Sequence, residues 1–222
     1  MQISALRAAA DFGTQVQQAA ERLAAERVYE RILARDHTVW RPDPTEIANR
    51  LGWLDSPRVM RDAIGPIHQC IDAVRADGYT HALLLGMGGS SLAPEVFRAV
   101  FGVADGFLDL SVLDSTQPDA VLAKARTLDP ARTLFLPATK SGGTVETLSL
   151  LKYFYNRTAN AVGLEKAGRH FAAITDPGSG LEALAQRLGF RHIFCNDPNI
   201  GGRYSALSYY GLVAAGAIGV AL

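Results

Sequence analysis

Three short segments contain the glycine and hydroxyl residues from which phosphate sites are commonly built. They are residues 86–91 (GMGGSS), residues 139–144 (TKSGGT) and residues 199–205 (NIGGRYS). Glycine lets a backbone approach a ligand closely, and the free N–H groups at the start of a helix bind anions. A tight turn between a strand and a helix uses the same residues, so each segment has to be interpreted in its context.

The first segment follows an apolar run and precedes a helical pattern with Pro94 in its first turn. It is not a Walker A loop, because no Gly-Lys-Ser/Thr follows it. It also departs from the dinucleotide fingerprint G-x-G-x-x-G, because Ser91 stands where the third glycine belongs. After the next apolar run no acidic residue is clearly placed to bind a ribose, although Asp114 is a candidate, so a dinucleotide site is the weaker interpretation.

The second segment brings three hydroxyls, two glycines and a predicted helix start together. These groups could offer a phosphate several donors and the positive end of the helix dipole. The alternative is a capping motif in which Ser141 or Thr144 only caps the helix. Two such loops at neighbouring strand ends favour the anion site.

The third segment places two glycines before Arg203, which lets the backbone turn tightly and direct a guanidinium into a cleft. Arginine suits a fixed role beside an oxyanion or phosphate, because it is always charged and its donors form a planar fork. The alternative is a surface arginine in a salt bridge.

Alternating apolar runs and helical patterns after Gly78 predict an α/β fold with a five-stranded, parallel, doubly wound sheet of the flavodoxin type. The predicted strands are residues 82–85, 108–113, 133–136, 171–174 and 192–195, and the predicted helices are residues 91–101, 119–127, 145–160 and 181–188. Ligands bind such sheets beyond the carboxyl ends of the strands. The three segments lie at those ends.

The apolar spacing of residues 15–36 and 58–76 predicts two helices in an N-terminal helical segment without chemistry of its own. The predicted domains are this segment, residues 1–77, and an α/β domain, residues 78–222. The first 13 residues have no long apolar stretch, so no signal peptide is predicted.

Lysine plus arginine and aspartate plus glutamate each total 22, so the formal net charge of the 222 residues is zero. This balance argues against a nucleic-acid partner and against a basic membrane-surface protein. The two cysteines, Cys70 and Cys195, cannot form a disulfide framework or a four-thiolate zinc site. We expect reduced thiols in a cytoplasmic protein and no metal site.

The run from Ala206 to Leu222 has no charged residue and is shorter than the ~20 residues that cross a bilayer. It is predicted to be a buried helix of a protein that does not enter a membrane. A bare apolar helix face seeks a partner. We therefore expect a homo-oligomer, or association through Ala206–Leu222, and a chain that stops short of its complete fold.

The three segments in this order resemble the sugar-isomerase (SIS) fold of the glucose-6-phosphate isomerase family. The matching stretches are LLLGMGGSSLAPE, ATKSGGTVET and IGGRYSALSYYG, and the resemblance covers roughly residues 78–222. LGWLD and SALSYYGLVAAGAIG look most like the isomerase half of bacterial transaldolase–isomerase fusions. Tyr209, Tyr210 and Pro198 depart from the common isomerase pattern.

The resemblance implies aldose–ketose isomerisation of glucose 6-phosphate and fructose 6-phosphate through an enediol, without metal or organic cofactor. It places Gly89, Ser90 and Ser91 on the sugar side of the cleft. It places Thr139, Lys140, Ser141, Gly142, Gly143 and Thr144 around the 6-phosphate, with Ser141 and Thr144 donating hydroxyls. It gives Arg203 the catalytic task of stabilising the enediolate.

The resemblance also implies that the glutamate base, a ring-opening histidine and a lysine lie beyond Leu222. The chain is therefore expected to be the N-terminal part of the enzyme, with a first SIS domain that stops near the start of the second, and to be inactive alone. A non-catalytic module that binds sugar phosphates is the alternative function. Arg203 favours the enzyme, because a sensor has no enediolate to stabilise.

Overall fold

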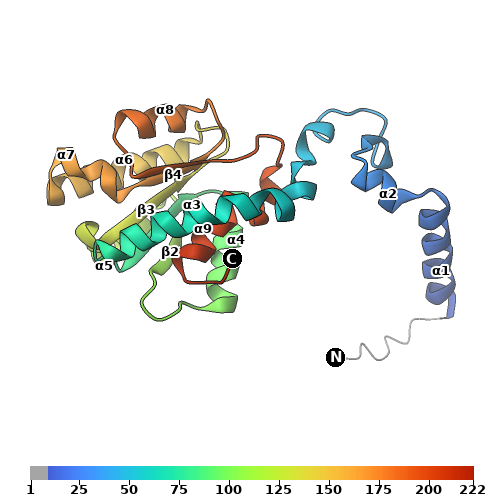
Figure 1. Ribbon diagram of the computed structural model, residues 1–222, viewed down its shortest axis with the longest axis horizontal. Coiled ribbons are helices and arrows are strands. Elements are labelled where there is room, and N and C mark those ends of the chain that lie inside the picture. The colour runs from blue at the N-terminus through green and yellow to red at the C-terminus, as the bar shows by residue number, and fades with distance from the viewer. Residues whose placement is uncertain (1–9) are drawn as a thin grey trace. The chain divides into compact units, whose positions relative to one another are not determined.

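The computed structural model describes residues 10–222 (Figure 1). The first nine residues, on which the prediction about a signal peptide and part of the predicted domain 1–77 fall, lie outside the described residues. The chain divides into two units, Met1–Leu51 and Gly52–Leu222. The second unit carries all three predicted site segments.

The first unit contains α1 (Ala10–Ala25), α2 (Val28–Leu33) and 3₁₀ turns at His37–Val39 and Ala48–Arg50. The prediction of one helix over residues 15–36 is wrong, because Arg27 takes a left-handed conformation with φ of 50°. A left-handed residue interrupts the helical hydrogen-bond ladder. Hydrophobic spacing continues across the break and therefore does not reveal it.

The second unit is built on five parallel strands in the order β2-β1-β3-β4-β5, which confirms the predicted fold class. The strands are β1 (His81–Gly86), β2 (Asp109–Leu113), β3 (Thr133–Ala138), β4 (Ala172–Thr175) and β5 (His192–Cys195). Strands β1 and β3 are neighbours although β2 lies between them in sequence, and their ends pair Gly86 with Ala138. The winding direction reverses at this pair.

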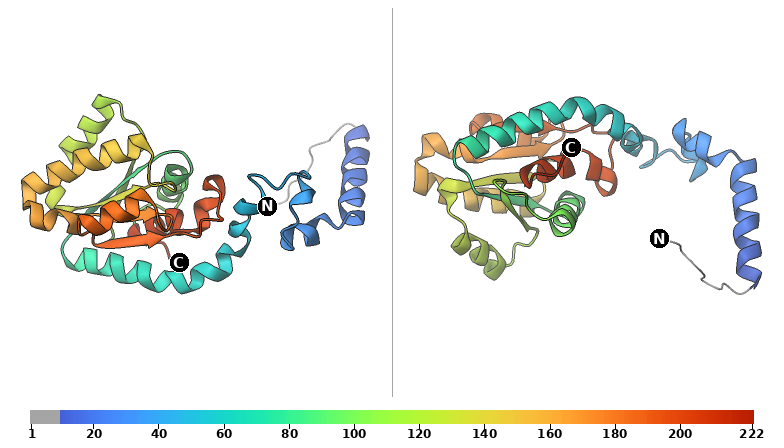
Figure 2. Two further views of the ribbon diagram at one scale, coloured as in Figure 1. Left: turned by 90° about the horizontal axis from the view of Figure 1, so that it is seen from above. Right: turned by 60° about the horizontal axis from the view of Figure 1, so that its bottom comes forward.

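Helices cover both faces of the sheet (Figure 2). They are α3 (Ser56–Ala76), α4 (Gly89–Phe101), α5 (Pro118–Thr127), α6 (Val145–Val162), α7 (Leu164–Ala167), α8 (Gly180–Arg187) and α9 (Tyr209–Ala217). Further 3₁₀ turns lie at Gly52–Asp55, Pro130–Arg132, Gly168–His170 and Gly202–Leu207. The helices α3, α4 and α9 pack on one face, and α5 to α8 pack on the other.

Helix α3 belongs to the α/β unit and not to a separate N-terminal segment. Its side chains Ile67, Ile71 and Val74 are buried in the same core as Leu84 of β1 and Leu134 of β3. The structure thus places the boundary after residue 51 and not after the predicted residue 77. The apolar spacing of residues 58–76 predicted this helix, but such spacing does not tell which surface the helix packs against.

The apolar run at Ala206–Leu222 is covered by its own chain. A 3₁₀ turn occupies its beginning, and Ser208 caps α9 by accepting a bond from the Tyr210 N–H (3.3 Å). Helix α9 packs on α3 and α4 and buries Val213, Ala214 and Ala217 completely. The premise that this face needs a partner is therefore wrong, and association of copies stays a prediction. Nowhere in residues 10–222 is a helix long and apolar enough to span a membrane.

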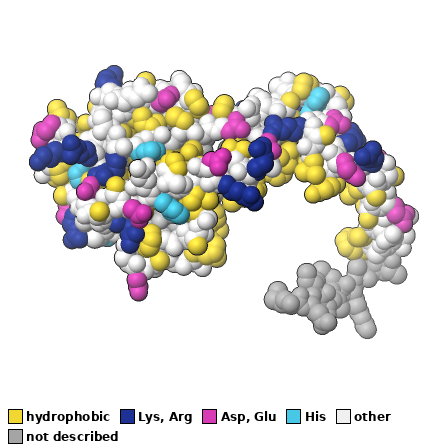
Figure 3. Space-filling model, in the orientation of Figure 1, with side chains coloured by type: hydrophobic (Ala, Val, Ile, Leu, Met, Phe, Trp, Pro, Cys, Tyr) yellow, Lys and Arg dark blue, Asp and Glu magenta, His cyan; other side chains and the backbone are white. Residues whose placement is uncertain are grey.

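Hydrophobic side chains also gather on the surface over α4 (Figure 3). Leu92, Val96 and Val100, which are spaced one helical turn apart, are each more than half exposed. Phe97, on the opposite face of the helix, packs against the core. Helix α4 therefore presents one apolar face to the sheet side and one to the surface.

Candidate functional site

The switch point between β1 and β3 brings two of the predicted segments together. Parallel strands end at the same edge of a sheet, and the β1–β3 pairing runs to Gly86 and Ala138, the last residue of each strand. The loops after these strands therefore leave the sheet side by side. Each leads within a few residues into a helix, α4 or α6. This is the position at which doubly wound folds bind ligands.

The loop after β1 turns sharply into α4 at Gly88, which has φ of 55° and ψ of −121°. The Ser91 side chain is buried, and its hydroxyl donates to the Gly88 carbonyl (2.9 Å). This bond commits Ser91 to the turn itself, whereas the neighbouring Ser90 is half-buried at the start of the helix. Of the two predicted serines, Ser90 is the better placed to meet a ligand.

The loop that carries Arg203 packs directly against this helix start. A Cβ atom added to Gly89 would lie 2.1 Å from the Gly202 carbonyl oxygen, so only glycine leaves room for the loop. The Ser205 hydroxyl donates to the Gly202 carbonyl at 2.7 Å. Gly202 is thereby held against the start of α4, and Arg203 follows it directly. The close approach joins the first and third predicted segments.

The loop after β3 is ordered by its own hydroxyls. The Oγ1 atoms of Thr139 and Thr144 are hydrogen-bonded at 2.7 Å, and the Ser141 hydroxyl accepts a bond from the Gly143 N–H at 3.2 Å. Gly142 has φ of 70°, and a side chain there would collide with the backbone at the start of α8. The loop conformation therefore depends on glycine at this position.

Helix α6 begins directly after this loop, and the side chain of its N-cap residue, Thr144, makes no capping bond. The capping alternative fails at this residue, because its hydroxyl is bonded to Thr139 instead. The first N–H groups of an 18-residue helix thus point toward the loop without a side-chain cap. Backbone donors and the helix dipole favour an anion here.

Thr147 is a residue that sequence analysis missed. It lies in the first turn of α6, three residues after Thr144, and its fully buried hydroxyl has no hydrogen-bond partner. A buried hydroxyl without a partner is costly, so Thr147 can donate to a water or an anion held at the start of α6. The sequence does contain a sign of this, because residues three apart lie on one face of a helix and Thr147 follows Thr144 by three.

Lys140, which the resemblance places around the phosphate, has its own partners in the structure. Its ammonium group forms a salt bridge with Asp176, which follows β4, and donates to the Pro198 carbonyl at 2.7 Å. Both partners belong to neighbouring loops, after β4 and after β5, and not to residues 139–144, the predicted phosphate loop. The side chains of Thr139, Ser141 and Thr144 therefore make bonds within the loop, while the Lys140 side chain reaches the loops after β4 and β5.

Arg203 is exposed next to the Gly202 contact, and the residue after it is held by a second contact. The Tyr204 ring stacks on Trp53, with centroids 5.6 Å apart and an interplanar angle of 23°. Trp53 belongs to the 3₁₀ turn that precedes α3, and the Gly52 N–H donates to the Asn199 carbonyl at 3.0 Å. These contacts fix both flanks of the arginine, so its backbone is anchored while its guanidinium stays accessible.

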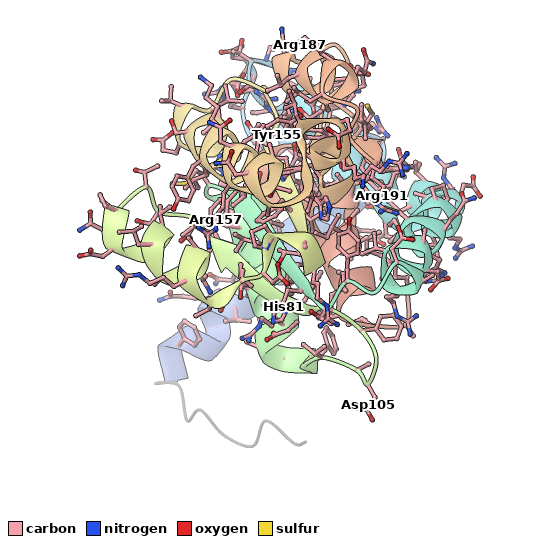
Figure 4. The ribbon with its side chains drawn as sticks, turned by 90° about the vertical axis from the view of Figure 1, so that its left-hand side faces the viewer. His81, Asp105, Tyr155, Arg157, Arg187 and Arg191 are labelled. Atoms are coloured by element: carbon pink, nitrogen blue, oxygen red, sulfur yellow. The ribbon has the colours of Figure 1, made fainter. Side chains whose placement is uncertain are left out.

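Three histidines at strand starts lie away from this site. His81 and His192 begin β1 and β5, and His170 comes just before β4, so all three occupy the amino edge of the sheet. Figure 4 faces this edge and shows His81 and Arg191 on it. Burial lowers the pKa of His170 and of His192. Both imidazoles are therefore mostly neutral near pH 7, and both lie at the sheet edge opposite the three segments.

Comparison with known proteins identifies the family of this chain. The family model described as phosphoglucose isomerase matches residues 60–221. The chain belongs to the phosphoglucose isomerase family. The match begins inside α3, in agreement with the packing of that helix in the α/β unit.

Relatives of this phosphoglucose isomerase family chain include a glucose-6-phosphate isomerase of Thermus thermophilus. It is 35% identical over 169 residues, which are 76% of this chain and 39% of the relative. The glucose-6-phosphate isomerase of Carboxydothermus hydrogenoformans is 32% identical over 180 residues, with 77% and 38% covered. The chain therefore spans about two fifths of the length of these curated relatives.

Two solved structures share the fold. A hypothetical protein from Thermus thermophilus has a TM-score of 0.76 and 31% identity, over 91% of this chain and 46% of that chain. A glucose-6-phosphate isomerase from Chlamydia trachomatis has a TM-score of 0.65 and 24% identity, over 85% of this chain and 35% of that chain. The second likeness is one of fold alone.

Proposed function

We propose that this chain supplies the phosphate-binding and enediolate-stabilising part of a cytoplasmic glucose-6-phosphate isomerase. The proposal rests above all on the close packing of Gly202 on Gly89, which brings Arg203 to the pair of loops at the β1–β3 switch point. One end of a sugar phosphate would then meet the Thr139–Thr144 loop, while its reacting carbons face Arg203. Membership of the family supports the reaction type.

In the proposed reaction, a base removes the proton from C2 of the open-chain aldose, and the electrons shift to the carbonyl oxygen at C1. The C2 hydroxyl then gives up its proton while O1 gains one, and a proton is delivered to C1 as the carbonyl forms at C2. This gives the ketose with no net gain or loss of protons or electrons. The enediolate carries negative charge that the aldose lacks. Arg203 would stabilise that charge, which is an interaction made mainly in the transition state.

The proposal assigns the base to a segment that follows Leu222, as the resemblance implies. The described histidines at strand starts lie at the opposite edge, and the Asp176 carboxylate is paired with Lys140. A positioned general base contributes about 10²–10⁴-fold. Residues 1–222 should therefore bind glucose 6-phosphate without converting it at an enzymatic rate.

A coupled assay tests this function in two proteins, the 222-residue chain and a longer protein that continues past Leu222. Turnover is expected only in the longer protein, and Arg203→Ala there should lower kcat by more than it raises KM. Arg203→Lys keeps the charge without the planar fork and serves as the matched variant. Full activity in Arg203→Ala would remove this residue from the mechanism. Binding without turnover in the longer protein would instead favour the non-catalytic module.

A further inference from the structure

The ammonium group of Lys140 links three strand ends at the cleft edge of the sheet. Lys140 follows β3, its salt-bridge partner Asp176 follows β4, and the carbonyl that accepts its second bond belongs to Pro198, after β5. The Lys140 and Asp176 side chains are 28% and 14% exposed, so the pair is largely withdrawn from water. A charge pair at this depth is screened less than a surface pair.

Other bonds hold β3 to β4 and β4 to β5 at this edge. The Thr175 hydroxyl donates to the Thr139 carbonyl at 2.7 Å, and the Asn196 N–H donates to the Thr175 carbonyl at 2.9 Å. Both bonds lie close to the sheet. Farther along the β5 loop, Pro198 is tied to the phosphate loop through the Lys140 side chain.

Besides the contacts of Asn199 and Tyr204 with the turn before α3, two anchors tie the β5 loop to the two loops at the switch point. Lys140 holds it at Pro198, and the start of α4 holds it at Gly202, where Gly89 leaves no space for a side chain. Arg203 follows the second anchor. The position of the guanidinium relative to the phosphate loop therefore depends on the Lys140 bridge as well as on the glycine contact.

We propose that Lys140 is a positioning residue that sets the spacing between the phosphate loop and Arg203, and that its ammonium does not bind the phosphate directly. The inference rests on the proposed function, because it concerns the two loops that would hold the two ends of the substrate. An ammonium paired with a carboxylate adds little net charge for a phosphate to attract. The ammonium instead donates to Asp176 and to the Pro198 carbonyl, and so joins the loops that carry them.

A binding experiment separates the two roles of Lys140. The probes are inorganic phosphate, which needs only the phosphate loop, and 6-phosphogluconate, whose carboxylate can also meet Arg203. Lys140→Met and Asp176→Asn should each weaken 6-phosphogluconate about tenfold, a change of about 1.4 kcal/mol. Each should change phosphate affinity by less than about twofold, and the double variant should be no weaker than either single variant, because both remove one bridge.

Direct phosphate binding by Lys140 predicts other results. Lys140→Met would then weaken both probes alike, and Asp176→Asn would tighten them, because it would release the ammonium. Either outcome overturns the inference. Lys166→Met, in an exposed lysine of α7, removes the same charge at the other edge of the sheet and serves as the control.

Hydrogen exchange without ligand tests the bridge independently of the proposed function. Lys140→Met should speed amide exchange in residues 197–205, whereas Lys166→Met should not. Unchanged exchange in Lys140→Met would refute the bridge whether or not phosphate binds. Faster exchange in a chain that binds neither probe would instead support the bridge, while refuting the proposed function and, with it, the positioning role.

Discussion

The contact between Gly89 and Gly202 predicts a large effect from a single methyl group. In Gly89→Ala, the new Cβ atom would lie 2.1 Å from the Gly202 carbonyl oxygen and 2.6 Å from its carbonyl carbon, whereas ordinary contact begins at about 3.4 Å. The Arg203 loop would have to retreat by about 1.3 Å. The atoms that the new methyl group would meet belong to the backbone of Gly202 and Arg203 and not to a flexible side chain, so the strain cannot be relieved by a rotamer change.

The expected cost exceeds the gain in helix propensity. Replacing glycine by alanine within a helix favours folding by at most about 1 kcal/mol, and Gly89 is the first residue of α4. Overpacking in a rigid environment costs about 1–3 kcal/mol. We therefore expect a net destabilisation of about 1–2 kcal/mol and a fall in Tm of about 2–8 °C.

Gly202→Ala is the matched control, because a Cβ atom at Gly202 would meet nothing within 4 Å. Thermal unfolding followed by circular dichroism should show a stability change within about 0.5 kcal/mol for this variant. In Gly89→Ala, the affinity for 6-phosphogluconate should fall as well, because Arg203 moves with its loop. Equal unfolding temperatures for Gly89→Ala and the wild type would refute the close packing of the two loops.

Titration and thiol chemistry supply two further predictions. Burial lowers the pKa of His170 and His192 below the ordinary 6.5. The unfolded chain therefore binds more protons than the folded chain once the pH falls below about 6.5. Stability should be full above that pH and decline below it. The urea midpoint should thus drop between pH 7.5 and 5.5, and His170→Phe should reduce the drop; a larger drop in the variant would contradict this. Burial raises the pKa of Cys70 to about 11, so its thiolate is about one part in a thousand at pH 8. The less buried Cys195 should react first with a thiol reagent, and simultaneous modification of both in the folded chain would be the contrary result.

The sheet could be predicted because parallel strands buried on both faces appear as continuous apolar runs. The predicted strand at residues 192–195 coincides with β5, and the other four agree to within two residues at each end. Helix α7 was missed because four residues are too few to show helical spacing. The break at Arg27 was missed because it lies in a backbone dihedral angle and not in the hydrophobic pattern.

The site was predictable where its residues are neighbours in sequence. The glycine and hydroxyl content of residues 139–144 indicated a loop that can receive an anion, and the structure shows its hydroxyls and helix start together. The partners of Lys140 are 36 and 58 residues away, and no local pattern announces them. A lysine in such a loop is naturally assigned to the phosphate, and only the fold shows its carboxylate partner.

The proposed role of Arg203 comes from the resemblance, and the position of its loop comes from the structure. The resemblance supplied the reaction and the role of Arg203, which geometry alone would leave as an exposed arginine beside two glycines. The structure supplied the packing of Gly202 on Gly89 and the buried hydroxyl of Thr147. Together they support the proposal that a sugar phosphate binds at one edge of the sheet.

The most direct test of the central claim is calorimetric titration of the 222-residue chain with glucose 6-phosphate, in the wild type and in the double variant Ser141→Ala, Thr144→Ala. We expect binding by the wild type and a loss of at least tenfold in affinity for the variant, because two hydroxyls of the loop at residues 139–144 are removed while the α6 amides remain. Ser149→Ala, an exposed serine farther along α6, should bind like the wild type. Equal affinity in the double variant and the wild type would contradict the assignment of the phosphate to this loop.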